Sequence, residues 1–445
     1  MSHFDVVVEG AGPAGATAAY YLAKQGKKVA LVDRAKFPRE KACGGGLCVH
    51  IEEFDHIISN WDDFLESRCL RGIVYGPDFT PVDYVSETPF FYNIRRLKFD
   101  NTLVQYAVAE GATLMDGIAV KNFEVHEDRV VTTLRNGEEL TSDVIIGAGG
   151  SFDMVSRRIR DIEKMPMKWR DQDIATALYF EVDVGREFMD RVYGEERISM
   201  AHIKYQNLDG YGWSFSKDTV LNVGIGCPRS VVKKIKKENP KWDERQYLLD
   251  YVDTLKEQGW FPKDMEIDRK MIAGSNIPVG MGMSCTVGDR MLVVGDAGGF
   301  VSPLSGEGLY YALDSGRIAA DSLDQLFKAG KFEKDSMMLY HNTWSDKWGD
   351  DLEWLKVAWH LLMVMPSSLI KYAALDEETK KFFTHMFVGS MPAAKIKNKV
   401  LALIAAGFLR HDFLSIVTGN NEQVPSITYR FWFFVVENYK KQHLE

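Results

Sequence analysis

The chain has 445 residues, a formal net charge of -9, and 46% hydrophobic and 26% charged residues. Its length favours two or three domains, and its composition is that of a globular protein. The acidic balance argues against a nucleic-acid partner, because binding to nucleic acid depends on a basic surface.

The cysteines and the apolar runs indicate the cellular compartment in which we expect the protein. Five cysteines at irregular spacing (Cys43, Cys48, Cys69, Cys227 and Cys285) give neither a disulfide framework nor a metal-ligand pattern. The longest apolar run, residues 400–409, is about half of the roughly 18 residues that a spanning helix needs. No signal peptide opens the chain. We therefore expect a cytoplasmic protein, with peripheral contact to a membrane left open, and no metal site.

The first 33 residues predict a βαβ unit. Residues 4–8 are an apolar run of strand length, residues 16–25 have helical spacing, and residues 28–32 predict a second strand that ends at Asp33. Glu9, at the end of the first strand, stands where such units usually carry a buried aliphatic residue. The motif itself does not account for this acid.

Three glycines of this unit fit the pattern G-x-G-x-x-G. Gly10 permits a tight turn, Gly12 lets a pyrophosphate approach the backbone, and Gly15 lets the helix pack closely on the sheet. Asp33 lies eighteen residues after Gly15, where a carboxylate can bind a ribose hydroxyl. The unit therefore predicts a dinucleotide site.

The next segment, KFPREKACGGGLC at residues 36–48, places three glycines between two cysteines. Gly44 to Gly46 let the backbone pass a flat ligand without a side-chain clash. Cys43 adds a small thiol beside that ligand, as a proton donor, a cavity wall or a buried inert residue. A thiol pair with Cys48 is geometrically possible, but an inert Cys48 is the favoured interpretation.

Two later segments complete the pattern. In YGWSFSKDTVLNVGIG (residues 211–226), Tyr211, Trp213 and Phe215 alternate, so they face one side of a strand and form either a core or a cavity wall. Residues 291–323 predict a buried strand, a glycine turn and a long helix that opens after Gly306-Glu307-Gly308. We expect Glu307 to cap that helix rather than to act as an acid.

These motifs resemble those of a known flavoprotein family. Four segments resemble the FAD fingerprints of glutathione-reductase-like flavoproteins. They are the glycine motif, NIRRLKFDNTL with Arg96, VIIGAGGSFDMVSRR, and Gly295-Asp296. Residues 37–46 and 211–226 resemble the P-R-x-K-x-C-G-G and Y-x-W-x-F-P…N-V-G-x-G stretches of geranylgeranyl reductases, which saturate prenyl double bonds with reduced FAD. Gly149 replaces an aspartate of the family, and Ser216 replaces a proline.

The resemblance implies an α/β fold, with a glutathione-reductase-like FAD-binding Rossmann domain, an antiparallel substrate sheet and a helical C-terminal region. It implies that Cys43, Tyr211, Trp213 and Phe215 are catalytic. For FAD binding it implies Gly10, Gly12, Ala14, Gly15, Asp33, Arg34, Arg39, Cys43, Gly44, Gly46, Arg96, Ala119, Gly295, Asp296, Gly306, Gly308 and Leu309.

The pattern of elements divides the chain into three regions. We expect the FAD domain at residues 1–70, 95–165 and 270–330, the substrate sheet at 70–95 and 165–270, and a helical domain at 331–445. In the last region, residues 354–370 and 395–411 predict helices that form either a helical core or a lid over a lipid cavity. Lys395, Lys397, Lys399 and Arg410 flank an apolar run that could lie on a membrane surface.

The expected reaction is the saturation of isoprenoid double bonds in a geranylgeranyl lipid. An archaeal-type glycerolipid is the first candidate, and a chlorophyll precursor or a quinone remains open. An alkene needs a proton on one carbon and a hydride on the other, so the site must be apolar, closed and supplied with one acid.

The electron source and two other reactions stay open from the sequence. No second dinucleotide motif is present, so we expect an external donor, either a ferredoxin-like protein or a reduced pyridine nucleotide. The alternative functions are an FAD-dependent monooxygenase or halogenase, and an electron-transfer flavoprotein that acts on a membrane quinone.

Overall fold

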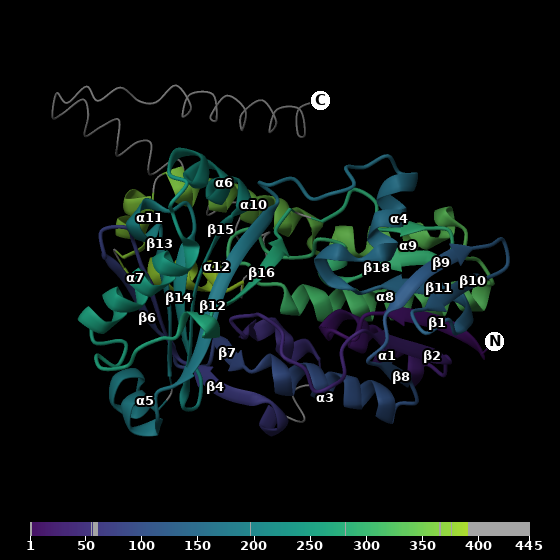
Figure 1. Ribbon diagram of the computed structural model, residues 1–445, viewed down its shortest axis with the longest axis horizontal. Helices are drawn as coiled ribbons and strands as arrows, with labels where there is room; N and C mark the ends of the chain where they lie inside the picture. Colours follow the sequence, from purple (N-terminus) through teal and green to yellow (C-terminus); the bar gives the residue numbers. More distant parts are fainter. Residues whose placement is uncertain are drawn as a thin grey trace. The chain divides into compact units, whose positions relative to one another are not determined.

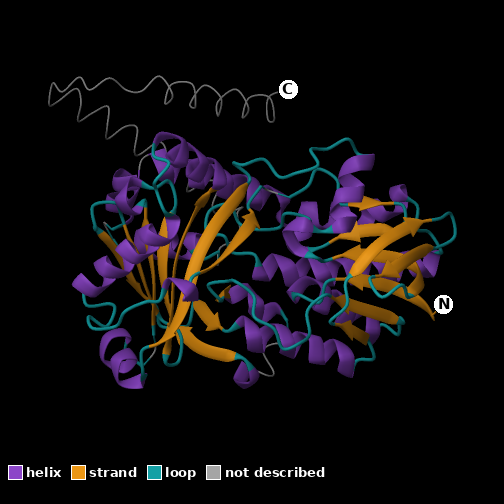
Figure 2. Ribbon diagram, viewed as in Figure 1, coloured by secondary structure: helices purple, strands orange, loops and turns teal. Residues whose placement is uncertain are grey.

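The computed structural model describes residues 2–54, 56, 61–195, 197–280, 282–364, 366–374 and 376–389. The predicted helix at residues 395–411, with its lysines and Arg410, lies outside these ranges. The described residues form two large sheets, joined by a small third sheet and flanked by helices (Figures 1 and 2).

The first sheet has eight strands and carries the predicted βαβ unit. Along its main path the order is β17-β18-β11-β1-β2-β8, and β10 and β9 extend it from β11. The strands from β18 to β8 are parallel, and β17, β10 and β9 pair antiparallel. The bounds are β1 Ser2–Glu9, β2 Val29–Asp33, β8 Thr113–Asp116, β9 Val120–Val125, β10 Val130–Leu134, β11 Glu139–Gly147, β17 Val287–Gly288 and β18 Met291–Val293.

Helices cover both faces of this sheet, as the continuous burial of β1 requires. Val6, Val7 and Val8 are all fully buried. On one face lie α1 (Pro13–Lys24), α3 (Arg96–Ala109) and α8 (Leu309–Ala329), and on the other lies α4 (Met154–Ile162). The α1 and α8 backbones approach closely, because a Cβ at Gly316 would lie 2.4 Å from the carbonyl oxygen of Ala14.

The second sheet has seven strands in the order β16-β12-β15-β14-β13-β5-β6. It is antiparallel as predicted, except that β5 and β13 pair in parallel. Strand β16 comes from the range expected for the FAD domain. The bounds are β5 Arg71–Tyr75, β6 Pro81–Val85, β12 Ile174–Asp183, β13 Ile198–Ile203, β14 Tyr211–Ser216, β15 Val220–Pro228 and β16 Ala273–Pro278.

One face of the second sheet is closed by three helices, α5 (Arg186–Tyr193), α6 (Arg229–Glu238) and α7 (Glu244–Glu257). The alternate residues of β14 show which face this is. The Ser214 hydroxyl lies 3.2 Å from the Tyr193 hydroxyl, and a Cβ on Gly212 would meet the ring of Tyr251 at 2.7 Å. The odd-numbered residues of β14 therefore point to the opposite face.

A small sheet that the sequence did not predict joins the two large ones. Its order is β3 (Gly46–Cys48), β7 (Phe91–Ile94) and β4 (Leu65–Cys69). Because β3 continues the glycine segment and β7 leads into α3, this sheet fixes the loop of Cys43 to the first domain.

The C-terminal part is helical in its described portion, as predicted. Helices α9 (Lys334–Trp344), α10 (Asp350–Val364), α11 (Pro366–Ala373) and α12 (Glu377–Phe387) follow one another, with a π-helical turn at Ser345–Gly349. Among the described helices none combines the length and the apolar character needed to cross a membrane.

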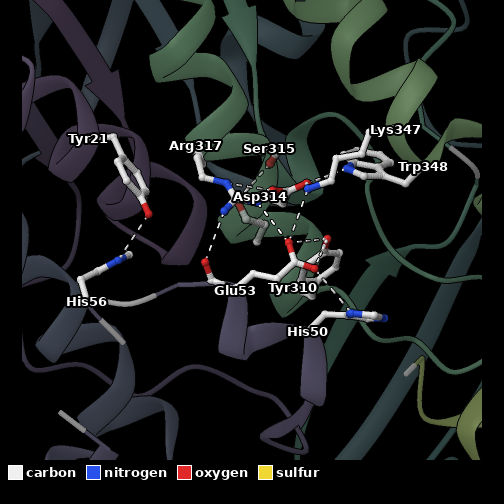
Figure 3. A network of polar contacts seen from close by, with 11 residues as sticks. Tyr21, His50, Glu53, His56, Tyr310, Asp314, Ser315, Arg317, Lys347 and Trp348 are labelled. Carbon is white, nitrogen blue, oxygen red and sulfur yellow. Dashed lines mark hydrogen bonds and ion pairs between the residues drawn. The ribbon is translucent and has the colours of Figure 1, made fainter. Parts of the chain in front are cut away.

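A buried polar network fastens α8 to the segments around it (Figure 3). The carboxylate of Asp314 has no exposed surface and accepts contacts from Arg317 at 2.5 Å, from Lys347 at 2.8 Å and from the Trp348 indole at 3.0 Å. Arg317 also reaches Glu53 of the short helix Val49–Glu53 at 3.2 Å. The network thus connects α8 to a segment that precedes it by about 260 residues and to the π-helical turn.

Within this network the charges are set by their neighbours. The hydrogen bond from His50, together with Lys347 and Arg317, lowers the pKa of Glu53 to about 2. Glu53 therefore stays ionised at neutral pH and remains a partner for Arg317.

We predict that Asp314→Ala lowers the free energy of unfolding by on the order of 3 kcal/mol, because it leaves two cations without their buried counterion. Urea denaturation measures this value. The control is Lys328→Ala in the same helix, whose ion pair with Asp324 is exposed and is worth less than about 1 kcal/mol. Equal losses for the two variants would contradict the central role of Asp314.

Candidate active site and cofactor site

One cavity of about 1000 Å³ runs from the glycine turn after β1 to the odd-numbered face of β14. It brings together every residue that the sequence singled out for cofactor binding or catalysis, with the exception of Gly15. Gly15 packs α1 on the turn instead, since a Cβ there would lie 1.9 Å from the carbonyl oxygen of Gly10.

At one end of the cavity, the glycine turn and Asp33 form a site for a dinucleotide. Gly12 is the N-cap of α1, no side chain caps this helix, and its first residues, Pro13 and Ala14, line the cavity. Each carboxylate oxygen of Asp33 accepts one backbone N–H, from Ala11 and from Ala35, both at 2.8 Å. The carboxylate is thereby fixed at the cavity wall, beside Arg34.

A second helix N-terminus faces the cavity from α8. Gly308 is its N-cap, and Asp296 and Gly306 line the cavity beside it. Glu307 accepts the backbone N–H of Tyr310 at 2.8 Å, so it caps the helix as predicted. A helix N-terminus stabilises negative charge on a ligand that it faces.

Glu307 is also a buried acid in the cavity wall. Burial raises its pKa to about 7, against the effect of the Tyr310 and Leu309 backbone N–H groups and of His50. Cys48 lies beside it, and burial raises the pKa of this thiol as well. Both cysteines of the glycine segment are free thiols, and Cys48 is fully buried, in agreement with the inert interpretation.

Two arginines share a buried carboxylate near Cys43. Arg96 binds Asp100 through two contacts, at 2.6 Å and 2.8 Å, and Arg39 lies 3.1 Å from the same carboxylate. The Cys43 side chain lies near the Arg96 guanidinium. Arg96 thus lines the cavity, but much of its hydrogen-bonding capacity is used within the protein.

Asn222 of β15 holds the Cys43 loop and the aromatic wall together. Its side-chain nitrogen donates to the Cys43 carbonyl oxygen at 3.0 Å and to Glu181 at 3.0 Å. Its side-chain oxygen accepts the indole N–H of Trp213 at 2.8 Å. Buried Lys217 forms an ion pair with Glu181 and completes the cluster. One amide therefore fixes the cysteine loop relative to the cavity wall.

Tyr211, Trp213 and Phe215 form that wall. Trp213 lies flat over strand β15, where a Cβ at Gly224 would be 2.1 Å from its ring. Tyr211 donates its phenol to the carbonyl oxygen of Ser305 and packs edge-on against Phe387 of α12. Ser216, in place of the family's proline, exchanges two hydrogen bonds with the Ile198 backbone of β13.

Sequence reasoning missed several residues of this site. Asn222 lies within a quoted motif, N-V-G-x-G, but its role was not inferred. Tyr179 and Glu181 belong to β12, which carries no motif, yet Tyr179 lines the cavity and Glu181 binds both Asn222 and Lys217. Only their alternation along a strand beside β15 could have indicated them.

Comparison with known proteins places this architecture in a family. Residues 4–180 match the model of the pyridine nucleotide-disulphide oxidoreductase family. The geranylgeranyl diphosphate reductase of Rhodobacter capsulatus is 30% identical over 334 residues, which cover 74% of this chain and 77% of the relative. The chain belongs to the geranylgeranyl reductase family.

Other relatives agree with this membership. The menaquinone reductase of Mycobacterium tuberculosis is 29% identical over 78% of this chain and 80% of its own. The digeranylgeranylglycerophospholipid reductase of Methanocaldococcus jannaschii is 27% identical over 77% and 83%. A geranylgeranyl bacteriochlorophyll reductase-like protein from Thermoplasma acidophilum has the same fold, with a TM-score of 0.73, 20% identity and coverage of 91% and 100%.

Like its family, the chain is an FAD-dependent oxidoreductase, and the site fits this cofactor. Gly12 leaves open space at the N-terminus of α1, since a Cβ there would meet only the Arg39 side chain, at 3.6 Å. That space suits a pyrophosphate. Asp33 lines the cavity where it would face a ribose, and Asp296 with the α8 N-terminus would face the flavin half.

We predict that Asn222→Leu frees the cysteine loop. The change removes three buried hydrogen bonds, so the free energy of unfolding should fall by about 2–3 kcal/mol. Alkylation of Cys43, followed by mass spectrometry of its peptide, should become several times faster. The control Thr132→Val alters a buried residue of β10 whose hydroxyl has no partner, and it should leave the alkylation rate unchanged. An unchanged rate in Asn222→Leu would contradict the clamp.

We predict a pH-dependent gain of stability in Glu307→Gln. Between about pH 4.5 and pH 7, folded wild type keeps a proton that the unfolded chain has released, so its stability falls as the pH rises. Glutamine removes this effect and still offers a capping oxygen. From pH 5 to pH 8, the variant should gain on the order of 3 kcal/mol relative to wild type in urea unfolding.

The control for this prediction is Glu238→Gln, at the exposed end of α6, which should follow the pH dependence of wild type. Parallel pH profiles for Glu307→Gln and wild type would show that Glu307 does not hold the extra proton.

Proposed function

We propose that this enzyme saturates isoprenoid double bonds of a geranylgeranyl lipid, with an archaeal-type glycerolipid as its first substrate candidate. The observation that supports this most is the cavity, in which the FAD-binding residues continue without a break into the aromatic wall of Tyr211, Trp213 and Phe215. A long apolar chain can lie along such a wall, with one double bond at the flavin end.

The chemistry that the chain must provide is a proton. When bound and reduced, FAD would supply a hydride for one alkene carbon, and the other carbon would need a proton from an acid in a closed, dry site. We assign this role to the Cys43 thiol. Its loop borders the cavity, and after the proton has left, the Gly45 N–H at 3.3 Å and the Arg96 guanidinium face the sulfur.

Electrons must come from outside the chain. We propose a ferredoxin-like protein or a reduced pyridine nucleotide as the donor of two electrons for each bond that is saturated. The lipid itself would be taken from a membrane surface. The end of α10 supports this, because Met363 and Val364 line the cavity and Val364 is 61% exposed.

A second substrate class has independent support. A relative named menaquinone reductase matches this chain about as well as those named for geranylgeranyl substrates. The isoprenoid side chain of a quinone offers the same trisubstituted double bonds, so the same residues would serve it.

The test is anaerobic incubation of the dithionite-reduced holoenzyme with each lipid, followed by mass spectrometry. A gain of two hydrogens for each reduced bond, in the glycerolipid or in the menaquinone, supports the proposal and selects the substrate. Product that forms only in the presence of oxygen would point to a monooxygenase or halogenase instead.

We predict that Cys43→Ser keeps FAD bound and slows alkene reduction at least about tenfold, or about 1.4 kcal/mol in the barrier. Serine has nearly the shape of cysteine but is a far weaker acid, so the change tests acidity more than packing. Single-turnover reduction under anaerobic conditions measures the rate. Reoxidation of the reduced enzyme by oxygen does not need this proton and serves as the internal control. Turnover equal to wild type would remove the thiol from the mechanism.

A further inference from the structure

Glu9 ends strand β1 at the point where the chain turns toward the cofactor site. Its register partners are Gly147 of β11 and Val32 of β2, and neither carries a charge. Alternation along the strand puts its side chain on the face of Val7. On that face lies the N-terminus of α4, which provides Asp153 and Arg157 as the charged groups near Glu9. Glu9, Gly149 and Arg157 all line the cavity.

The carboxyl of Glu9 lies near the place that a side chain at position 149 would start to fill. A Cβ built on Gly149 would be 3.7 Å from one Glu9 oxygen and 3.0 Å from an Asp153 oxygen. Asp153 is itself committed to the backbone, because it accepts the N–H groups of Gly149 at 2.9 Å and of Ser156 at 2.6 Å. Of these two acids, Glu9 is therefore the one that remains available to bind a ligand at the place where the resemblance implies an aspartate.

One oxygen of the Glu9 carboxyl lacks a hydrogen-bond partner within the protein. The Met154 N–H faces its carboxyl, but the second oxygen, Oε2, is buried and has no hydrogen-bond partner. Burial, and then the nearby Asp153 carboxyl, raise the pKa of Glu9 well above its ordinary value, so the side chain is neutral at pH 7. A neutral acid carries an O–H donor and does not repel a phosphate.

We propose that Glu9 is a cofactor-binding residue, whose carboxyl O–H donates a hydrogen bond to an oxygen of the sugar–phosphate chain of FAD. Its carboxyl lies beside Gly149, the position where the resemblance implies an aspartate. The proximity of the Gly10–Gly12 turn and of Arg157 in the same cavity wall assigns the contact to this part of the cofactor. This inference rests on FAD binding and not on the identity of the lipid.

The experiment measures FAD dissociation from the purified holoprotein. Wild type, Glu9→Gln and Glu9→Leu are diluted stepwise, and released FAD is followed by the recovery of its fluorescence. Glu9→Leu should weaken binding about tenfold or more, the value of one buried hydrogen bond to a charged acceptor. Glu9→Gln keeps a neutral N–H donor and should stay within about threefold of wild type.

The matched control is Thr17→Val in α1, which alters another buried side chain whose hydroxyl has no partner but which does not line the cavity. Its FAD affinity should equal that of wild type. Unchanged affinity in Glu9→Leu would overturn the proposal, and so would a loss in Glu9→Gln as large as that in Glu9→Leu. Should Glu9→Leu not fold, a crystal structure of the FAD-loaded wild type decides: no FAD oxygen within roughly 3.5 Å of the Glu9 carboxyl refutes the contact.

Discussion

The tight passage of residues 44–46 between strand β7 of the small sheet and strand β14 of the second sheet is the constraint on which the site depends. A Cβ on Gly46 would lie 2.1 Å from the Phe91 ring, one on Gly45 2.2 Å from the Ile94 carbonyl oxygen, and one on Gly44 2.9 Å from the Phe215 ring. At Gly45, whose φ is +78°, the obstacle is backbone, and at Gly44 and Gly46 an aromatic ring would have to move. The segment can therefore enter the small sheet at β3 while Cys43 lines the cavity, so the protein's own packing favours the three glycines.

Burial determines the charge in this cavity more than the sequence suggests. Glu9 and Glu307 would both be anions in water, yet desolvation raises the pKa of each. Each acid lies at a helix N-terminus, Glu9 near α4 and Glu307 before α8. Because Glu307 is only partly ionised near pH 7, it neutralises the N-terminus of α8 less than an ordinary glutamate would, whereas the N-terminus of α4 is already capped by Asp153.

The sequence predicted the local parts of this structure and missed the long-range ones. The βαβ unit, the α8 helix with its Glu307 cap, and the alternating face of β14 follow from patterns within about 30 residues. Asn222, Asp153 and the Asp314 network do not, because their partners are set by how distant segments pack. Glu9 lies between these cases. The sequence showed an acid where an aliphatic residue is usual, but only the structure showed that this acid lies beside Gly149.

Of the residues that the sequence singled out as catalytic, Cys43 and Tyr211 carry a proton on sulfur or oxygen, and their hydrogen bonds separate them. The Tyr211 phenol donates to the Ser305 carbonyl oxygen, and burial raises its pKa, so this proton is both engaged and held more tightly than in water. The Cys43 sulfur instead accepts a hydrogen bond from the Gly45 N–H. Its loop is fixed beside Trp213 by Asn222. The arrangement therefore favours the thiol as the acid and Tyr211 as a wall whose position is fixed through Ser305.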